Sequence, residues 1–138
     1  EDADGALARG GDVVAHIGLR SFYDPRLVKP FRYEPWKGID AINSFYDFAK
    51  ESDVKVYYLF PCYPRSNFNS NQAALRKITA DVKKVIHVPI LNSESDFVYA
   101  DTLFYDTKYH LTGVGRELRT DRMIDILKIK GVLNHPSN

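Results

Sequence analysis

An aspartate, a lysine and a histidine lie close together near the end of the chain, in the stretch FYDTKYHLTGVGRELRT at residues 104–120. His110 follows Asp106 by four residues, and two glycines then lead into a segment with helical periodicity. A histidine that acts as a general base needs an acceptor for its second ring nitrogen, which a nearby carboxylate supplies. The stretch therefore predicts an acid–base pair, although a helix cap at His110 with a solvated Asp106 explains the same residues.

The rest of the chain alternates apolar runs with amphipathic segments. Apolar residues at three- and four-residue steps predict helices at 36–50, 71–84 and 112–130. In the last of these, Leu118, Ile124 and Leu127 are the expected core contacts. Short runs rich in β-branched and apolar residues predict strands at 12–18, 55–61 and 85–91. This alternation is typical of an α/β fold, in which a parallel sheet carries helices on both faces.

In such a fold, the loops at the carboxyl ends of the strands hold the polar residues that could bind a ligand. In parallel sheets, ligands bind beyond the carboxyl ends of the strands. The loops expected to leave those ends cover residues 19–35, 61–72 and 92–112, and the last of them contains both Asp106 and His110. The first holds several aromatic residues, which either cover the sheet edge or form a wall on which a sugar ring could stack: Phe22, Tyr23, Phe31, Tyr33 and, just beyond the loop, Trp36.

Composition is that of one globular domain. The 138 residues are 44% hydrophobic and 27% charged, enough to bury a core. We expect a flexible arm at 1–11, a single α/β domain at 12–131 and a tail at 132–138. The net charge of +1 gives no electrostatic footprint for nucleic acid. No apolar run approaches the roughly 20 residues of a membrane-spanning helix.

Cofactor and metal motifs are not found in the sequence. Cys62 is the single cysteine, which excludes an internal disulfide and a multi-cysteine zinc site. No histidine spacing typical of a metal site is present either. We therefore expect neither a cofactor nor a metal. Cys62 is expected to be a small packing residue.

The C-terminal stretch DTLFYDTKYHLTGVGRELRT resembles the last block of SGNH/GDSL-type hydrolases, especially bacterial cell-envelope members. The resemblance extends back through VYYLFPCYP and VPILNSESDF. It implies a flavodoxin-like or SGNH-like three-layer sandwich, in full or as its C-terminal portion. It also implies a serine esterase or acetyl-transfer activity on O-acyl groups, often those of glycans, with His110 as the base and Asp106 as its orienting acid. The family's common spacing is Asp-x-x-His, one residue shorter than the spacing here.

The family that the chain resembles also has two conserved sequence blocks that this chain lacks. The family's Gly-Asp-Ser block after the first strand and its Gly-x-Asn-Asp block are both absent, and GGDVVAH places Val13 where the nucleophile would be. Within the chain, Ser21 in HIGLRSFYD is the candidate nucleophile, and a loop serine that only closes a turn is the preferred explanation of the same residue. Histidine and aspartate need a serine and oxyanion donors to perform acyl transfer.

Three functions remain open at this point. The chain is an SGNH-like esterase or acetyl-transfer domain, a catalytically inactive relative that binds a glycan or protein partner, or an unrelated α/β binding module. It begins with Glu1 and its one methionine is Met123, which favours a piece of a longer protein and predicts either a missing N-terminal half or self-association. The resemblance implies an extracytoplasmic or periplasmic location, and the cytoplasm remains an alternative.

Overall fold

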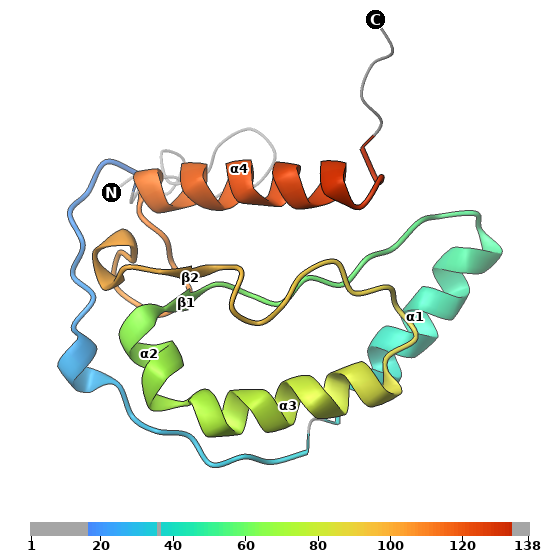
Figure 1. The fold of residues 1–138 in the computed structure, drawn as a ribbon, viewed down its shortest axis with the longest axis horizontal. Helices are drawn as coiled ribbons and strands as arrows, with labels where there is room; N and C mark the ends of the chain where they lie inside the picture. Colours follow the sequence, from blue (N-terminus) through green and yellow to red (C-terminus); the bar gives the residue numbers. More distant parts are fainter. Residues whose placement is uncertain (1–16, 36, 134–138) are drawn as a thin grey trace, which may run out of the picture.

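The computed structural model describes residues 17–35 and 37–133. These residues form α-helices, short 3₁₀ helices and a small parallel sheet (Figure 1). In chain order the elements are a 3₁₀ helix at Pro25–Leu27, α1 (Ile39–Glu51), β1 (Tyr63–Pro64), α2 (Arg65–Ser70), α3 (Gln72–Val85), β2 (Val98–Tyr99), a 3₁₀ helix at Asp101–Leu103 and α4 (Gly113–Ile129). The three helices predicted from periodicity correspond to α1, α3 and α4 and are confirmed.

The sheet is parallel, as predicted, but its strands are shorter than predicted. β1 and β2 pair with Tyr63 opposite Val98. Earlier in the same two segments, Tyr58 and Ile90 form one isolated parallel bridge. The prediction of continuous strands over 55–61 and 85–91 was therefore wrong, although the two segments do run side by side in the same direction.

The physical reason is an insertion in the second segment. Tyr63 follows Tyr58 by five positions, whereas Val98 follows Ile90 by eight, so the two segments cannot stay in register between the bridges. The surplus residues form a turn at 93–96, in which Asp96 Oδ2 accepts hydrogen bonds from the Ser93 N–H at 2.7 Å and the Ser93 hydroxyl at 2.9 Å. This turn interrupts the ladder between the two bridges.

A buried side chain replaces the missing ladder contacts. Asn92, which is only 8% exposed, accepts a hydrogen bond from the Phe60 N–H at 2.7 Å and donates one to the Phe60 carbonyl at 3.3 Å. The amide thus satisfies both backbone groups of Phe60, which the neighbouring strand would otherwise bind.

The two faces of the segment at 56–62 pack against different helices. Tyr58 and Phe60 belong to an apolar cluster with Val82 of α3 and Ile39 of α1. Their neighbours Tyr57 and Leu59 belong to a second cluster, which includes Leu91, Phe97 and Ile126 of α4. This alternation is that of an extended segment with apolar packing on both sides, although only Phe60 is buried and residues 56–59 are half-buried.

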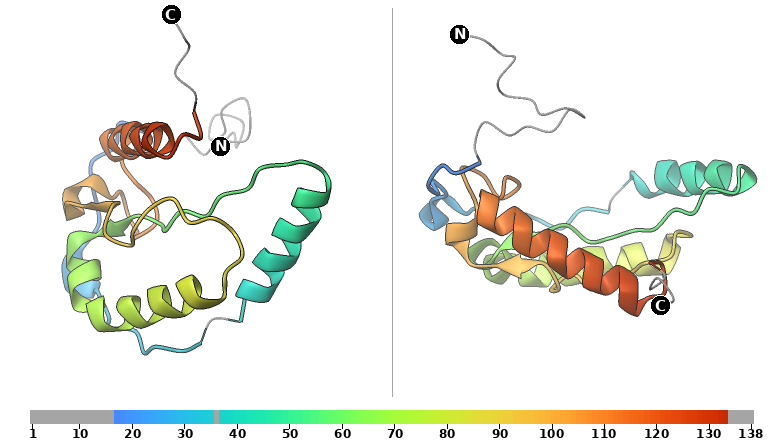
Figure 2. Two further views of the ribbon diagram at one scale, coloured as in Figure 1. Left: turned by 45° about the vertical axis from the view of Figure 1, so that its right-hand side comes forward. Right: turned by 90° about the horizontal axis from the view of Figure 1, so that it is seen from above.

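The views in Figures 1 and 2 agree with this division. Helix α4 runs along one side of the two paired segments, α3 runs along the other, and α1 lies at the end of the molecule away from β1 and β2. The structure thus has mixed helix and strand content with a small parallel sheet. In the part of the chain that it describes, no helix combines the length and apolarity needed to cross a membrane.

Three further segments differ from the sequence-based expectation or lie beyond its test. The first predicted strand, 12–18, lies outside the described residues except for Ile17 and Gly18, which form a turn. The polar loop predicted at 65–72 instead contains α2, whose Ser66 N–H is bound by the Asp101 carboxylate at 3.0 Å. The assignment of Leu118 to the core was also wrong, because its side chain is 45% exposed.

Candidate functional site

The candidate acid–base pair lies in a loop that connects the Asp101–Leu103 turn to α4. Phe104 and Leu111 form an antiparallel bridge at the base of this loop. Above it the Tyr105 N–H donates to the His110 carbonyl at 2.7 Å. The base is firmly held because Phe104 is fully buried and Leu111 is 5% exposed. The loop therefore presents residues 106–109 at its tip, on a base that belongs to the core.

The start of α4 is tied to the same base. Thr112 is the N-cap, and its hydroxyl accepts a hydrogen bond from the Gly115 N–H at 3.3 Å. The Thr112 N–H and hydroxyl both donate to the Leu103 carbonyl, at 2.9 and 3.2 Å. Gly115 permits this approach, since a Cβ there would lie 2.5 Å from the Leu103 carbonyl oxygen. The loop and the helix thus meet at a fixed junction next to His110.

The structure brings His110 and Asp106 together. The His110 Nδ1 lies 2.9 Å from Asp106 Oδ1, and the two side chains are 60% and 44% exposed. The spacing of four residues, longer than the family's common one, therefore still allows the contact. Because a carboxylate only accepts hydrogen bonds, Nδ1 carries the proton, and the basic lone pair of a neutral His110 then lies on Nε2. That is the arrangement a general base needs.

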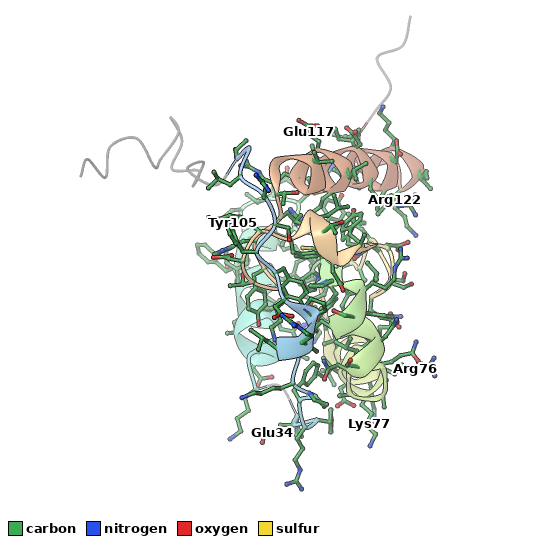
Figure 3. All side chains as sticks on the ribbon, turned by 90° about the vertical axis from the view of Figure 1, so that its left-hand side faces the viewer. Glu34, Arg76, Lys77, Tyr105, Glu117 and Arg122 are labelled. Carbon is green, nitrogen blue, oxygen red and sulfur yellow. The ribbon has the colours of Figure 1, made fainter. Side chains whose placement is uncertain are left out.

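Ser21 lies in a segment that runs beside this loop. The Phe22 N–H donates to the Tyr105 carbonyl, and the two rings stack edge to face with centroids 5.7 Å apart. Figure 3 looks at this end of the molecule, where Tyr105 lies beside the segment that begins at residue 17. The Ser21 hydroxyl accepts a hydrogen bond from the Tyr23 N–H at 3.3 Å, which is the turn contact that the sequence left open. Two backbone hydrogen bonds thus link the Ser21 segment to His110 through Tyr105.

Aromatic rings and a lysine surround the loop. Lys108 Nζ lies 5.1 Å from the centre of the Tyr109 ring and 5.9 Å from that of Phe31. Phe22 is 71% exposed and Tyr109 is 68% exposed, whereas Tyr23 packs on Phe104. Trp36 lies outside the described residues. Lys108, the lysine that the sequence places between Asp106 and His110, thus lies against two aromatic rings.

The remaining reactive groups do not join this loop. Cys62 is half-buried among the apolar contacts beneath α4, and burial raises the pKa of its thiol above the ordinary value. Such a thiol is a weak nucleophile at neutral pH. Among residues 17–35 and 37–133, no three His, Cys, Asp or Glu side chains gather closely enough to hold a metal ion.

Comparison with known proteins gives no relative against which to align this site. No protein-family model matches the chain, and neither a curated protein nor a solved structure does.

Proposed function

We propose that His110 and Asp106 are the general base and its orienting acid in a serine-type esterase or acetyl-transfer site. The substrate class is an O-acyl ester, with the acetyl groups of glycans as the first candidates. The observation that supports this proposal is the 2.9 Å contact between His110 Nδ1 and Asp106 Oδ1 on an exposed loop. The resemblance of the DTKYHL segment to SGNH/GDSL-type hydrolases supports the same assignment.

The chemistry follows from the position of the lone pair. Nε2 of His110 takes the proton of a serine hydroxyl as the serine oxygen attacks the acyl carbonyl, and Asp106 stabilises the resulting imidazolium. The imidazolium then gives the proton to the departing alcohol, which leaves an acyl-serine. Water, or the hydroxyl of an acceptor in a transfer reaction, repeats the sequence and regenerates the serine.

Ser21 is the proposed nucleophile within this chain, and its support is indirect. The hydrogen bond between Phe22 and Tyr105 places its segment beside the loop. The half-buried hydroxyl, however, accepts a hydrogen bond from Tyr23. The family blocks that supply the serine and the oxyanion donors are absent from these 138 residues. We therefore expect little or no ester hydrolysis by this chain alone.

The fold proposal accompanies the chemical one. We propose the flavodoxin-like or SGNH-like three-layer sandwich, in full or as its C-terminal portion, which the parallel pair β1–β2 between α3 and α4 supports. An extracytoplasmic or periplasmic location fits the same family. We also expect the chain either to self-associate or to be completed by an N-terminal half. Sedimentation velocity of the chain measures its self-association directly.

A binding module is the second candidate. The turn contact of Ser21 favours it, since this hydroxyl serves the backbone. So does Lys108, whose Nζ lies 5.1 Å from the centre of the exposed Tyr109 ring, because this pair suits a ligand with apolar and polar faces. In that case the same loop binds a glycan or a protein partner without chemistry.

Hydrolysis of 4-nitrophenyl acetate separates the candidates. The assay uses the 138-residue chain and the full product of its reading frame, each with His110→Ala, Asp106→Asn and Ser21→Ala variants. His87→Ala is the matched control, because this histidine is 59% exposed and also lies near an aspartate, Asp47.

In the full product we expect hydrolysis to fall at least about 100-fold in the His110 and Asp106 variants and to be unchanged in the control. Loss in Ser21→Ala assigns the nucleophile to this serine, and full activity there places it in another segment. Robust hydrolysis that survives His110→Ala contradicts the proposal. If the full product hydrolyses neither this ester nor acetylated glycans, the esterase proposal is excluded and the binding module is the candidate that stands.

A further inference from the structure

A concave site lies on the other half of α4. It is a pocket of about 470 Å³ between α3, the loop after Leu91 and the C-terminal half of α4, and we call it the α3–α4 pocket. None of its lining residues belongs to the loop that holds His110. From Thr112, next to His110, to Ile126 in the pocket, the helix rises about 21 Å. The pocket is therefore a separate site.

The interruption of the parallel ladder forms one wall of this pocket. The turn at 93–96 leaves the line of the strand, and Ser93 and Asp96 both line the pocket. Asn92, which also lines it, is held rigid by its two hydrogen bonds to Phe60. Local interruptions of a ladder are often found beside binding sites because they redirect side chains. Here the redirected side chains face α4.

The pocket carries more positive than negative charge. Three cations line it, Lys83, Arg122 and Lys130, against one carboxylate, Asp96. Asp96 already accepts the Ser93 hydrogen bonds and a contact from Arg122 Nη2 at 3.2 Å. Since the whole chain carries a net charge of only +1, this local excess is marked.

The cations differ in how far they are already paired. Lys83 Nζ lies 3.6 Å from a Glu94 carboxylate oxygen, and Arg122 Nη2 lies 3.2 Å from Asp96 Oδ1. No carboxylate in the described residues pairs with Lys130. A guanidinium has five N–H donors, so Arg122 retains donors for a further anion. Arg122 and Lys130 are therefore the groups best placed to bind one.

Apolar side chains form the remaining wall. Leu91 and Ile126 are buried at 7% and 6% exposure and form the floor, with the half-buried Ile90 beside them. Ile129, also part of the lining, is 76% exposed. A ligand with an apolar body would cover Ile129 and gain the free energy of removing that surface from water.

We propose that the α3–α4 pocket binds a small organic anion. Its carboxylate or phosphate group contacts Arg122 and Lys130, and its apolar portion packs on Ile126 and Ile129. Neither an anion without an apolar portion nor an apolar cation satisfies both parts of this lining.

Methyl NMR of the full 138-residue chain tests the proposal. The probes are octanoate, octyl phosphate, octylammonium, acetate and inorganic phosphate. We expect octanoate, octyl phosphate or both to shift the Ile126 and Ile129 methyl signals saturably, and whichever binds more tightly identifies the anionic group. We expect the other three probes to leave these signals in place.

Charge variants complete the test. Arg122→Gln and Lys130→Gln should each weaken binding about tenfold, whereas Lys128→Gln, a change in the same turn of α4 outside the pocket, should not. Lys130→Gln breaks no ion pair of the described residues, so it remains informative if Arg122→Gln disturbs the turn at 93–96. Equal shifts with octylammonium, no saturable shift with either amphiphilic anion, or equal weakening in all three variants overturns the proposal.

Discussion

The contact between His110 and Asp106 is open to solvent, which separates its role in chemistry from any role in stability. The two side chains are 60% and 44% exposed. Exposed ion pairs contribute little to folding because water and salt screen them. We expect His110→Ala and Asp106→Asn to change the free energy of unfolding by no more than about 0.5 kcal/mol, measured by urea denaturation. A loss of several times that amount would mean that the pair serves the fold.

Asp96, in contrast to the His110–Asp106 pair, is a carboxylate that we expect to stabilise the fold. Burial alone would raise the pKa of its carboxyl, but hydrogen bonds from Ser93 and the contact with Arg122 outweigh it and hold that pKa below its ordinary value. A carboxyl whose pKa is lower in the folded state stabilises the fold above the unfolded pKa of about 3.9. This stabilisation is lost as the pH falls through the folded pKa.

We therefore expect Asp96→Asn to lose about 1–3 kcal/mol of stability at pH 7 and to lose less than the unaltered chain on acidification. Urea denaturation from about pH 7 down to about pH 3 measures the loss of stability at neutral pH and the further loss on acidification. Asp125→Asn, on the exposed surface of α4, is the control. Parallel pH profiles for the unaltered chain and Asp96→Asn would contradict the assignment.

At the scale of elements, the junction between the loop and α4 depends on Gly115. A Cβ at Gly115 would lie 2.5 Å from the Leu103 carbonyl oxygen, a backbone atom that cannot move alone. At Gly113 a Cβ would lie 3.3 Å from a side-chain methyl of Ile17. We expect Gly115→Ala to cost about 1–3 kcal/mol despite the better helix propensity of alanine.

Gly113→Ala is the matched control for this prediction. It should leave stability unchanged or raise it by up to about 1 kcal/mol, because alanine favours the helix and the neighbouring side chain can yield. Thermal and urea unfolding of both variants measure the difference. Equal stability of the two variants would show that α4 does not need its close approach to Leu103.

The elements also show which features a sequence can predict. Helices α1 and α3 were predictable because their apolar residues repeat locally along one face. Helix α4 was also predicted, although its apolar residues are not confined to one face. Helix α2 was not, because the Asp101 carboxylate that binds the Ser66 N–H lies 35 residues away. The break in the ladder was hidden for the same reason, since it depends on the Asn92 side chain binding the Phe60 backbone. Tertiary partners decided both features.

The candidate site shows the same division. Asp106 and His110 were predictable as neighbours because four residues within one loop separate them. The position of Ser21 beside Tyr105 was not, because it rests on a backbone hydrogen bond between distant segments. Leu118 was misassigned because the apolar residues of α4 are not confined to one face, and the large apolar residue that this helix buries is Ile126.

At the scale of the molecule, α4 joins two sites of different character. Its first turn is fixed to the loop of His110, and its last turns line the α3–α4 pocket. The two sites lie at opposite ends of the helix, and no residue of the loop that holds His110 lines the pocket. The proposed chemistry at one end and the proposed anion site at the other can therefore be tested independently.

The tautomer of His110 tests the central claim most directly, because the proposed chemistry requires Nδ1 to donate to Asp106. Nitrogen-15 NMR of the histidine rings above neutral pH distinguishes the tautomers. We predict protonated Nδ1 in His110, a return to protonated Nε2 in Asp106→Ala, and protonated Nε2 in His87, whose Nδ1 lies 3.7 Å from Asp47, beyond a hydrogen bond. A neutral His110 with its proton on Nε2 in the unaltered chain would contradict the account.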